Sequence, residues 1–174
     1  QVDPHQRLGL ELASEAVENA GIDPKKFTGS DTAVYMGVDS EDYSGMDMED
    51  LPTMEAWSGI GTAYHGIPNR ISYHLGVQGP STSVDAGCAS SVIAIPLARQ
   101  AIVCGESTVA ISGGVNVISA PGRTHILQQK GALTPEGVCR SFDDAACGYA
   151  RREGGAVVVK KRLSAALEDN DNIL

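Results

Sequence analysis

The sequence predicts an α/β domain with a mixed sheet, and three observations support that prediction. Apolar segments of strand length alternate with segments of helical periodicity along the 174 residues. About half of the chain is apolar when glycine is counted, which is typical of a globular protein. No internal repeat, low-complexity tract or linker divides the chain, so we expect one domain or part of a larger one.

The helices are predicted from apolar spacing and from end signals. Asp3-Pro4 opens the first helix and Gly21 ends it. Ile67, Ile71 and Leu75 repeat at helical spacing in the second. The third is a long run of small and apolar residues that predicts a buried helix. In chain order, the predicted helices lie at 4–20, 63–75, 88–103 and from 163 to 168.

The strands are predicted from short apolar or β-branched runs that end at glycine or at polar residues. In chain order, they lie at 32–37, 81–85, 108–112 and 155–161. Gly113-Gly114 is predicted to end the third strand. The segment 115–144 is rich in glycine and proline and predicts no regular element.

The charge of the chain excludes two classes of partner. The formal net charge is −9, the wrong sign for holding nucleic acid or an anionic membrane through a basic face. No uncharged stretch reaches the roughly 18 apolar residues of a membrane span. Between Asp39 and Glu55 the chain carries seven acidic residues and no Lys or Arg. This run predicts a solvated surface loop.

The chain shows no targeting segment and no metal or nucleotide motif. It begins at Gln1 without a signal peptide or an initiator Met, as expected for an internal piece of a longer protein. The four cysteines form no CxxC pair, and the four histidines have no ligand spacing. We therefore expect a cytoplasmic protein with reduced thiols, no bound metal and no directly bound cofactor.

Cys88 is the candidate catalytic residue. The predicted strand 81–85 ends just before it, two small residues make a turn, and Cys88 falls in the first turn of the predicted helix. Free N–H groups and the helix dipole stabilise a thiolate there, and they also bind the oxyanion that forms when sulfur attacks a carbonyl. The alternative is that Cys88 is a buried small apolar residue. Cys104, Cys139 and Cys147 lack this context and are interpreted as structural.

The segment around Cys88 resembles the active-site signature of the β-ketoacyl synthases, the condensing domains of polyketide and fatty-acid synthases. Residues 84–92 read Val-Asp-Ala-Gly-Cys-Ala-Ser-Ser-Val. Further segments match in the family's order: Asp-Pro-His-Gln-Arg-Leu at 3–8, Asn-Arg-Ile-Ser-Tyr-His-Leu-Gly at 69–76, Gly-Gly-Val-Asn at 113–116, and Gly-Val-Cys-Arg-Ser-Phe-Asp at 137–143. The sequence at 49–52 and 55–64 is most similar to that of fungal iterative synthases of the 6-methylsalicylic acid type.

This resemblance implies a thiolase-like layered fold, of which 1–174 is the N-terminal part. It implies that Cys88 carries an acyl thioester and condenses it with malonyl on an acyl carrier protein by a decarboxylative Claisen reaction. The phosphopantetheine arm of the carrier delivers the substrates, and an acyltransferase domain lies in the same chain. The family's two catalytic histidines, in His-Gly-Thr-Gly-Thr and Lys-Ser-Asn…Gly-His contexts, have no counterpart among the histidines of these 174 residues.

The resemblance also implies a homodimer that pairs near the strand 81–85. The carrier is acidic in this family, so we expect it to avoid 39–55 and to dock on a basic face that includes Arg70, Arg123 or Lys130. Arg152 stands where the family usually has glycine, which requires either an ordinary φ or a strained backbone.

Two alternatives remain open at this stage. The first is a thiolase that acts on CoA esters, although the segment 137–143 resembles synthases. The second is a non-catalytic partner related to condensing enzymes, in which Cys88 would be no more reactive than Cys104.

Overall fold

The fold is a four-stranded mixed sheet covered by helices on both faces, in a computed structural model that describes residues 2–49 and 51–174. The strands lie in the order β2-β1-β3-β4, with bounds β1 (Ala33–Gly37), β2 (Ser81–Val84), β3 (Val109–Asn116) and β4 (Gly154–Lys161). β1 is parallel to β2 and β3, whereas β4 is antiparallel to β3. The predicted α/β class and mixed sheet are confirmed.

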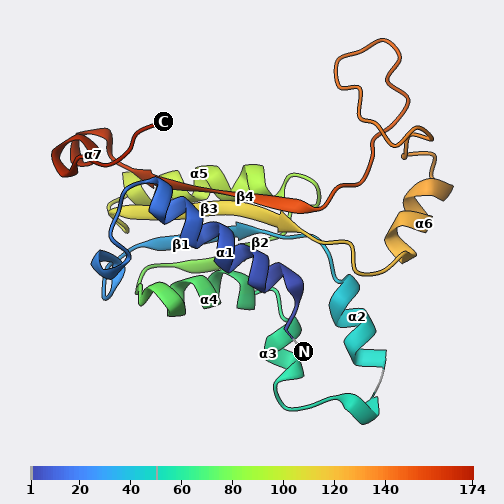
Figure 1. Ribbon diagram of the computed structural model, residues 1–174, viewed down its shortest axis with the longest axis horizontal. Coiled ribbons are helices and arrows are strands. Elements are labelled where there is room, and N and C mark those ends of the chain that lie inside the picture. The colour runs from blue at the N-terminus through green and yellow to red at the C-terminus, as the bar shows by residue number, and fades with distance from the viewer. Residues whose placement is uncertain (1, 50) are drawn as a thin grey trace.

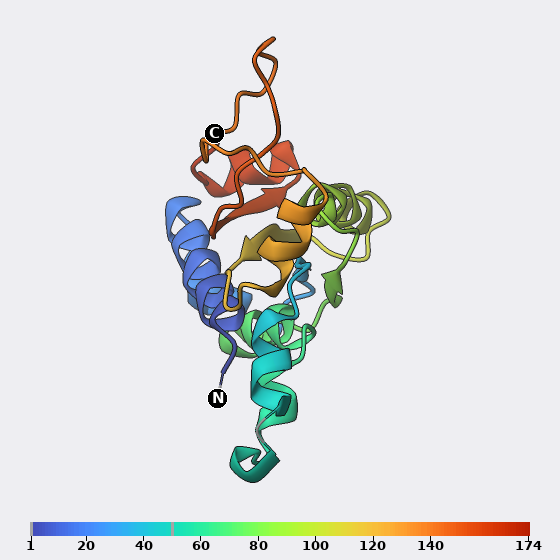
Figure 2. The same ribbon diagram turned by 90° about the vertical axis from the view of Figure 1, so that its right-hand side faces the viewer.

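The two faces of the sheet are packed differently. Helices α1 (Pro4–Asn19) and α4 (Gly66–Leu75) cover one face, and α5 (Ser90–Val103) covers the other (Figures 1 and 2). The core under α1 and α4 contains larger side chains, including Met36, Ile67, Ile71 and Ile111. The core under α5 is built mainly from alanines, namely Ala33, Ala98, Ala101 and Ala110. Small side chains let α5 lie close to the sheet.

The remaining elements lie outside these layers. The α2–α3 arm (39–62) contains α2 (Asp42–Glu49), the short 3-10 helix η2 (Leu51–Thr53) and α3 (Ser58–Thr62), and it projects from the body (Figure 1). A second 3-10 helix, η1 (Pro24–Phe27), follows α1. Helix α6 (Gly122–Gln129) comes after β3, and α7 (Leu163–Asp169) follows β4.

Three predicted element boundaries are wrong. Helix α4 begins at Gly66, because Ala63 has extended backbone (φ −72°, ψ 138°). Helix α5 begins at Ser90, so Cys88 precedes it. Strand β3 continues through Gly113-Gly114 to Asn116 and pairs with β4 along its whole length.

The acidic run and the segment 115–144 also differ from the prediction. The run from Asp39 to Glu55 contains α2, although α2 buries none of its residues; Asp50 and Gln1 lie outside the described residues. The segment 115–144 contains α6. Helix α5, predicted to be buried, buries only one face, and Val92, Ile95 and Val103 are exposed on the other.

Candidate active site

Cys88 lies in a short turn that joins the end of β2 to the start of α5. Gly87 adopts a left-handed conformation (φ +59°), which glycine accepts without steric cost, and its N–H donates to Asp85 (3.1 Å). The buried hydroxyl of Ser90 donates to the carbonyl of Gly87 (2.6 Å) and accepts from the N–H of Ala86 (2.9 Å). These bonds hold the turn on both sides of Cys88.

Two glycines let the start of α5 press against the ends of the central strands. A Cβ atom on Gly37, the last residue of β1, would lie 2.4 Å from the backbone nitrogen of Ser91. A Cβ atom on Gly114 of β3 would lie 2.6 Å from the Cβ of Ser91. Neither distance leaves room for a side chain. The position of the turn is therefore set by backbone contact with the sheet.

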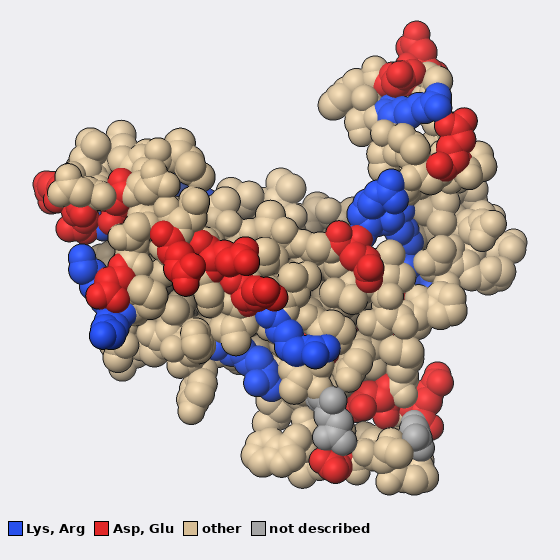
Figure 3. Space-filling model, in the orientation of Figure 1, with Lys and Arg blue, Asp and Glu red and all other residues tan. Residues whose placement is uncertain are grey.

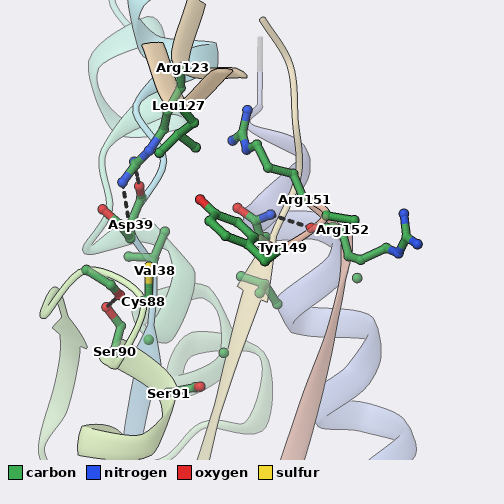
Figure 4. A pocket seen from close by; sticks show the side chains of 17 residues that line it. Val38, Asp39, Cys88, Ser90, Ser91, Arg123, Leu127, Tyr149, Arg151 and Arg152 are labelled. Atoms are coloured by element: carbon green, nitrogen blue, oxygen red, sulfur yellow. Dashed lines mark hydrogen bonds and ion pairs between the residues drawn. The ribbon is translucent and has the colours of Figure 1, made fainter. Parts of the chain in front are cut away.

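The Cys88 side chain is exposed and lines a cavity of about 410 Å³ (Figure 4). This exposure contradicts the interpretation of Cys88 as a buried apolar residue. The cavity lies at the ends of β1 and β3, between the Cys88 turn (85–91), α6 and the segment that leads into β4. Its lining residues with apolar or aromatic side chains include Val38, Val115, Leu127 and Tyr149.

Arg123 and Asp39 form an ion pair in the wall of this cavity. A guanidinium nitrogen of Arg123 donates to the Asp39 carboxylate (2.7 Å), and the other terminal nitrogen donates to the Asp39 carbonyl. The hydrogen bond to Asp39 raises the pKa of Arg123 against the opposing effect of burial, and the negative charges of Asp39 and Asp42 raise it further. Arg123 and Cys88 line the same cavity.

The structure places Arg123 in the Cys88 cavity rather than on an open basic face. Arg70 and Lys130 are the other two candidates for that face. Arg70 donates through Nε to the buried side chain of Gln6. Lys130 is exposed just after α6. Arg70 and Arg123 are thus held by neighbouring groups, and a docking face that includes Arg70, Arg123 or Lys130 stays a prediction.

A buried histidine supports the opposite wall. His5 is fully buried, and its Nε2 accepts a hydrogen bond from the N–H of Val117 (2.8 Å). The proton therefore lies on Nδ1, which donates to the carboxylate of Asp3 (2.6 Å). Val117 follows Asn116, a cavity residue whose amide donates to the carbonyl of Arg152 (2.6 Å). No pattern in the sequence indicated these bonds.

The substitution at Arg152 does not strain the backbone. Within the described ranges, the non-glycine residues with positive φ are Phe142 and Asn170. Arg152 therefore adopts an ordinary φ, and its side chain donates to the carbonyl of Gly137 (2.7 Å). Arg151 donates to the hydroxyl of Thr124 (2.6 Å) and so connects this wall to α6.

The other sequence-level candidates lie outside the cavity. Cys104, Cys139 and Cys147 are exposed and free, and none of them lines it. The same holds for His65, His74 and His125, which are also exposed. Apart from Gln1 and Asp50, no group of three His, Cys, Asp or Glu residues is arranged to bind a metal ion. No helix among the described residues is long and apolar enough to cross a membrane.

The site therefore consists of an exposed cysteine in a tight turn between a strand and a helix, beside a cavity at the end of a mixed sheet. Residues 1–166 match the family described as "Beta-ketoacyl synthase, N-terminal domain". The chain belongs to this family, and the predicted resemblance is confirmed.

The chain is similar to fungal polyketide synthases over its whole length. It is 60% identical over 174 residues to a mellein synthase from Phaeosphaeria nodorum. It is also 60% identical, over 173 residues, to a 6-methylsalicylic acid synthase from Aspergillus terreus. The match covers 100% and 99% of this chain, respectively, but only 10% of each of these relatives.

Solved ketosynthase structures share the fold. The ketosynthase from module 6 of the bacillaene synthase of Bacillus subtilis superposes with a TM-score of 0.88 at 32% identity, over 99% of this chain and 29% of that one. An oxazolomycin ketosynthase domain from Streptomyces albus gives a TM-score of 0.86 at 35% identity, over 98% of this chain and 29% of the other. The fold expected from the resemblance is therefore confirmed.

Proposed function

We propose that this chain supplies the nucleophile of a polyketide-forming ketosynthase and that Cys88 is that nucleophile. One observation carries the proposal: Cys88 is exposed in an open cavity, in a turn that the hydrogen bonds of Ser90 and the close contact of Gly37 hold in place. A nucleophile on a rigid element is positioned for attack without further ordering of the backbone. Residues 1–174 form the N-terminal part of a longer thiolase-like domain in this proposal.

The reaction proceeds through a covalent intermediate. The Cys88 thiolate attacks the carbonyl of an acyl thioester, the N–H of Cys88 is one donor to the oxyanion, and the carrier thiolate leaves. A malonyl thioester then loses CO₂, and the resulting carbanion attacks the acyl-Cys88 carbonyl. A carbon–carbon bond forms, and Cys88 leaves as the thiolate. In this proposal, the histidines that assist decarboxylation are not among the four histidines of this chain.

The proposed partners follow from the same chemistry. A phosphopantetheine arm on an acyl carrier protein brings the acyl and malonyl groups to the open cavity, and an acyltransferase domain of the same polypeptide loads the carrier. The free cysteines agree with a reducing compartment such as the cytoplasm. The protein is a homodimer in this proposal, and the free edge of β2 supports pairing there. Sedimentation of the intact ketosynthase as a monomer would exclude that assembly.

The test replaces Cys88 in the intact synthase. Cys88→Ala is expected to abolish condensation while the thermal unfolding midpoint stays nearly unchanged, because one small exposed side chain replaces another. Cys104→Ala is the matched control, since Cys104 is also exposed and lies outside the cavity. Its activity is expected to stay within a few-fold of the wild type. Equal losses in the two variants would contradict the assignment of Cys88.

A further inference from the structure

The cavity beside Cys88 offers an acyl chain a charged wall as well as an apolar one. Val38, Val115 and Leu127 provide apolar surface, whereas Arg123 and Asp39 place an ion pair on the same cavity. Figure 4 shows the Arg123–Asp39 pair on the side of the cavity next to Cys88. A cavity shaped only for saturated chains would leave this pair facing methylene groups, at a cost in desolvation.

The geometry holds the Arg123 guanidinium in place and leaves part of it free. Asp39 accepts from both terminal nitrogens, one through its carboxylate and one through its carbonyl. Arginine carries more N–H donors than these two acceptors use, so donors remain for a ligand. The two partners come from different elements, α6 and the segment after β1, and the bond between Arg151 and Thr124 fixes α6 from the other side.

We propose that Arg123 is a specificity-determining residue that selects acyl groups carrying a ketone oxygen over saturated acyl groups of the same length. The inference rests on the proposed function, because it requires the acyl group to be on Cys88. A ketone oxygen of the bound acyl chain accepts from the free N–H donors of Arg123. A saturated chain of equal length leaves those donors without a partner.

The size of this preference follows from the exposure of the pair. Rejection of an analogue that lacks a hydrogen-bonding group is strongest where the protein donor is fully buried. The side chains of Arg123 and Asp39 keep 39% and 29% of their surface exposed, so water compensates part of the loss. A hydrogen bond to a charged group under these conditions corresponds to a preference of about tenfold.

The experiment measures acylation of Cys88 in the intact synthase without malonyl substrate. Acetoacetyl and butyryl thioesters of N-acetylcysteamine are compared, because they have the same chain length and differ in one ketone. The wild type is expected to react about tenfold faster with the acetoacetyl thioester. Arg123→Met removes the donors at similar length and is expected to lower the ratio to near one. Arg140→Met is the control, since Arg140 pairs with Glu136 outside the cavity and should keep the ratio.

The outcomes distinguish a failure of this inference from a failure of the proposed function. Equal rates for the two thioesters in the wild type, or an unchanged ratio in Arg123→Met, overturn the role of Arg123 and leave the Cys88 assignment intact. Absence of acylation by either thioester overturns the proposed function as well. If Arg123→Met does not fold, Asp39→Ala removes the carboxylate that holds the guanidinium, and Arg123 keeps its charge. A ratio that stays at the wild-type value in that variant also overturns the inference.

Discussion

The Cys88 turn (85–91) and the α2–α3 arm leave the same end of the sheet but differ in how tightly they are packed. In the turn, Ser90 is buried and Ser91 lies against two glycines of the strands. In the arm, α2 buries no residue, and large apolar side chains are exposed, namely Met46, Met48, Leu51, Met54 and Trp57. On the face shown in Figure 3, acidic side chains gather on the arm and basic ones do not.

In the turn, the position of the backbone depends on close contact with the strands. On the arm, most side chains contact solvent rather than backbone. A methyl group added at Gly37 displaces backbone atoms of Ser90 and Ser91, because no free space separates this end of the turn from β1. The same change at Gly45 or Gly59 of the arm meets no atom within 4 Å. The two regions should therefore respond in opposite ways to identical substitutions.

The largest effect is expected for alanine at Gly37. The new Cβ would lie within 2.7 Å of three backbone atoms of Ser90 and Ser91, so α5 must shift. We expect a loss of about 2 kcal/mol in the free energy of unfolding and slower alkylation of Cys88 by iodoacetamide. Gly45→Ala is the control, because no atom lies within 4 Å of its added Cβ in α2. It should stabilise the fold slightly. Equal effects in urea unfolding would refute the packing contrast.

A similar loss is expected when His5 is replaced by leucine. His5→Leu removes the side-chain donor to the buried Asp3 carboxylate, which keeps only the backbone N–H of residue 5, and leaves the Val117 N–H without its acceptor, at a cost of about 1–3 kcal/mol. His5→Gln restores a donor and an acceptor and should recover most of that stability. His74→Leu, at an exposed site on α4, serves as the control in the same thermal unfolding assay. If glutamine recovers nothing, the hydrogen bonds of His5 do not hold this wall.

A smaller effect is expected from Lys160, which lies under α5. Its Nζ donates to the Ile95 carbonyl (3.0 Å) and to the Ser112 hydroxyl (2.7 Å), and burial lowers the pKa of Lys160. Below this lowered pKa, Lys160 is charged in both states, and its partial burial makes the charged form less favourable in the folded state. The folded state is therefore destabilised relative to the unfolded chain. That cost disappears as the pH rises towards the ordinary lysine pKa of 10.5. The stability of the wild type relative to Lys160→Met should therefore increase with pH in this window. A pH-independent difference would contradict the burial effect.

The smallest effect is expected from neutralising the arm. Asp47→Asn combined with Glu49→Gln removes negative charge from α2, which has no buried residue. Because we expect the proposed carrier protein to be acidic, the Michaelis constant for a carrier supplied in trans should stay flat or fall slightly. A many-fold rise that disappears at high salt would show that the arm attracts the carrier.

The sequence predicted the features that depend on local pattern. The four strands and the family could be predicted, because period, turn residues and the motif at 84–92 are local signals. Gly113-Gly114 was interpreted as the end of a strand. In the structure, however, these glycines make room for Ser91 and for Ala156 of β4, a contact between distant parts of the chain.

The features that the sequence could not predict depend on tertiary contacts. Helix α2 has no apolar face to reveal it, and its acidic residues predict a loop equally well. The ion pair of Arg123 joins residues 84 positions apart, and the bond between His5 and Val117 spans 112. No pattern within either segment indicates its partner.

Mapping the acyl group on the intact synthase is the most direct test of the proposal that Cys88 is the nucleophile. The protein is incubated with an acetyl thioester, digested at low pH to preserve thioesters, and analysed by peptide mass spectrometry. We expect one acetyl group on the peptide that contains Cys88 and none on the peptides that contain Cys104, Cys139 or Cys147. Acetylation spread equally over the four cysteines, or absent from Cys88, would contradict it.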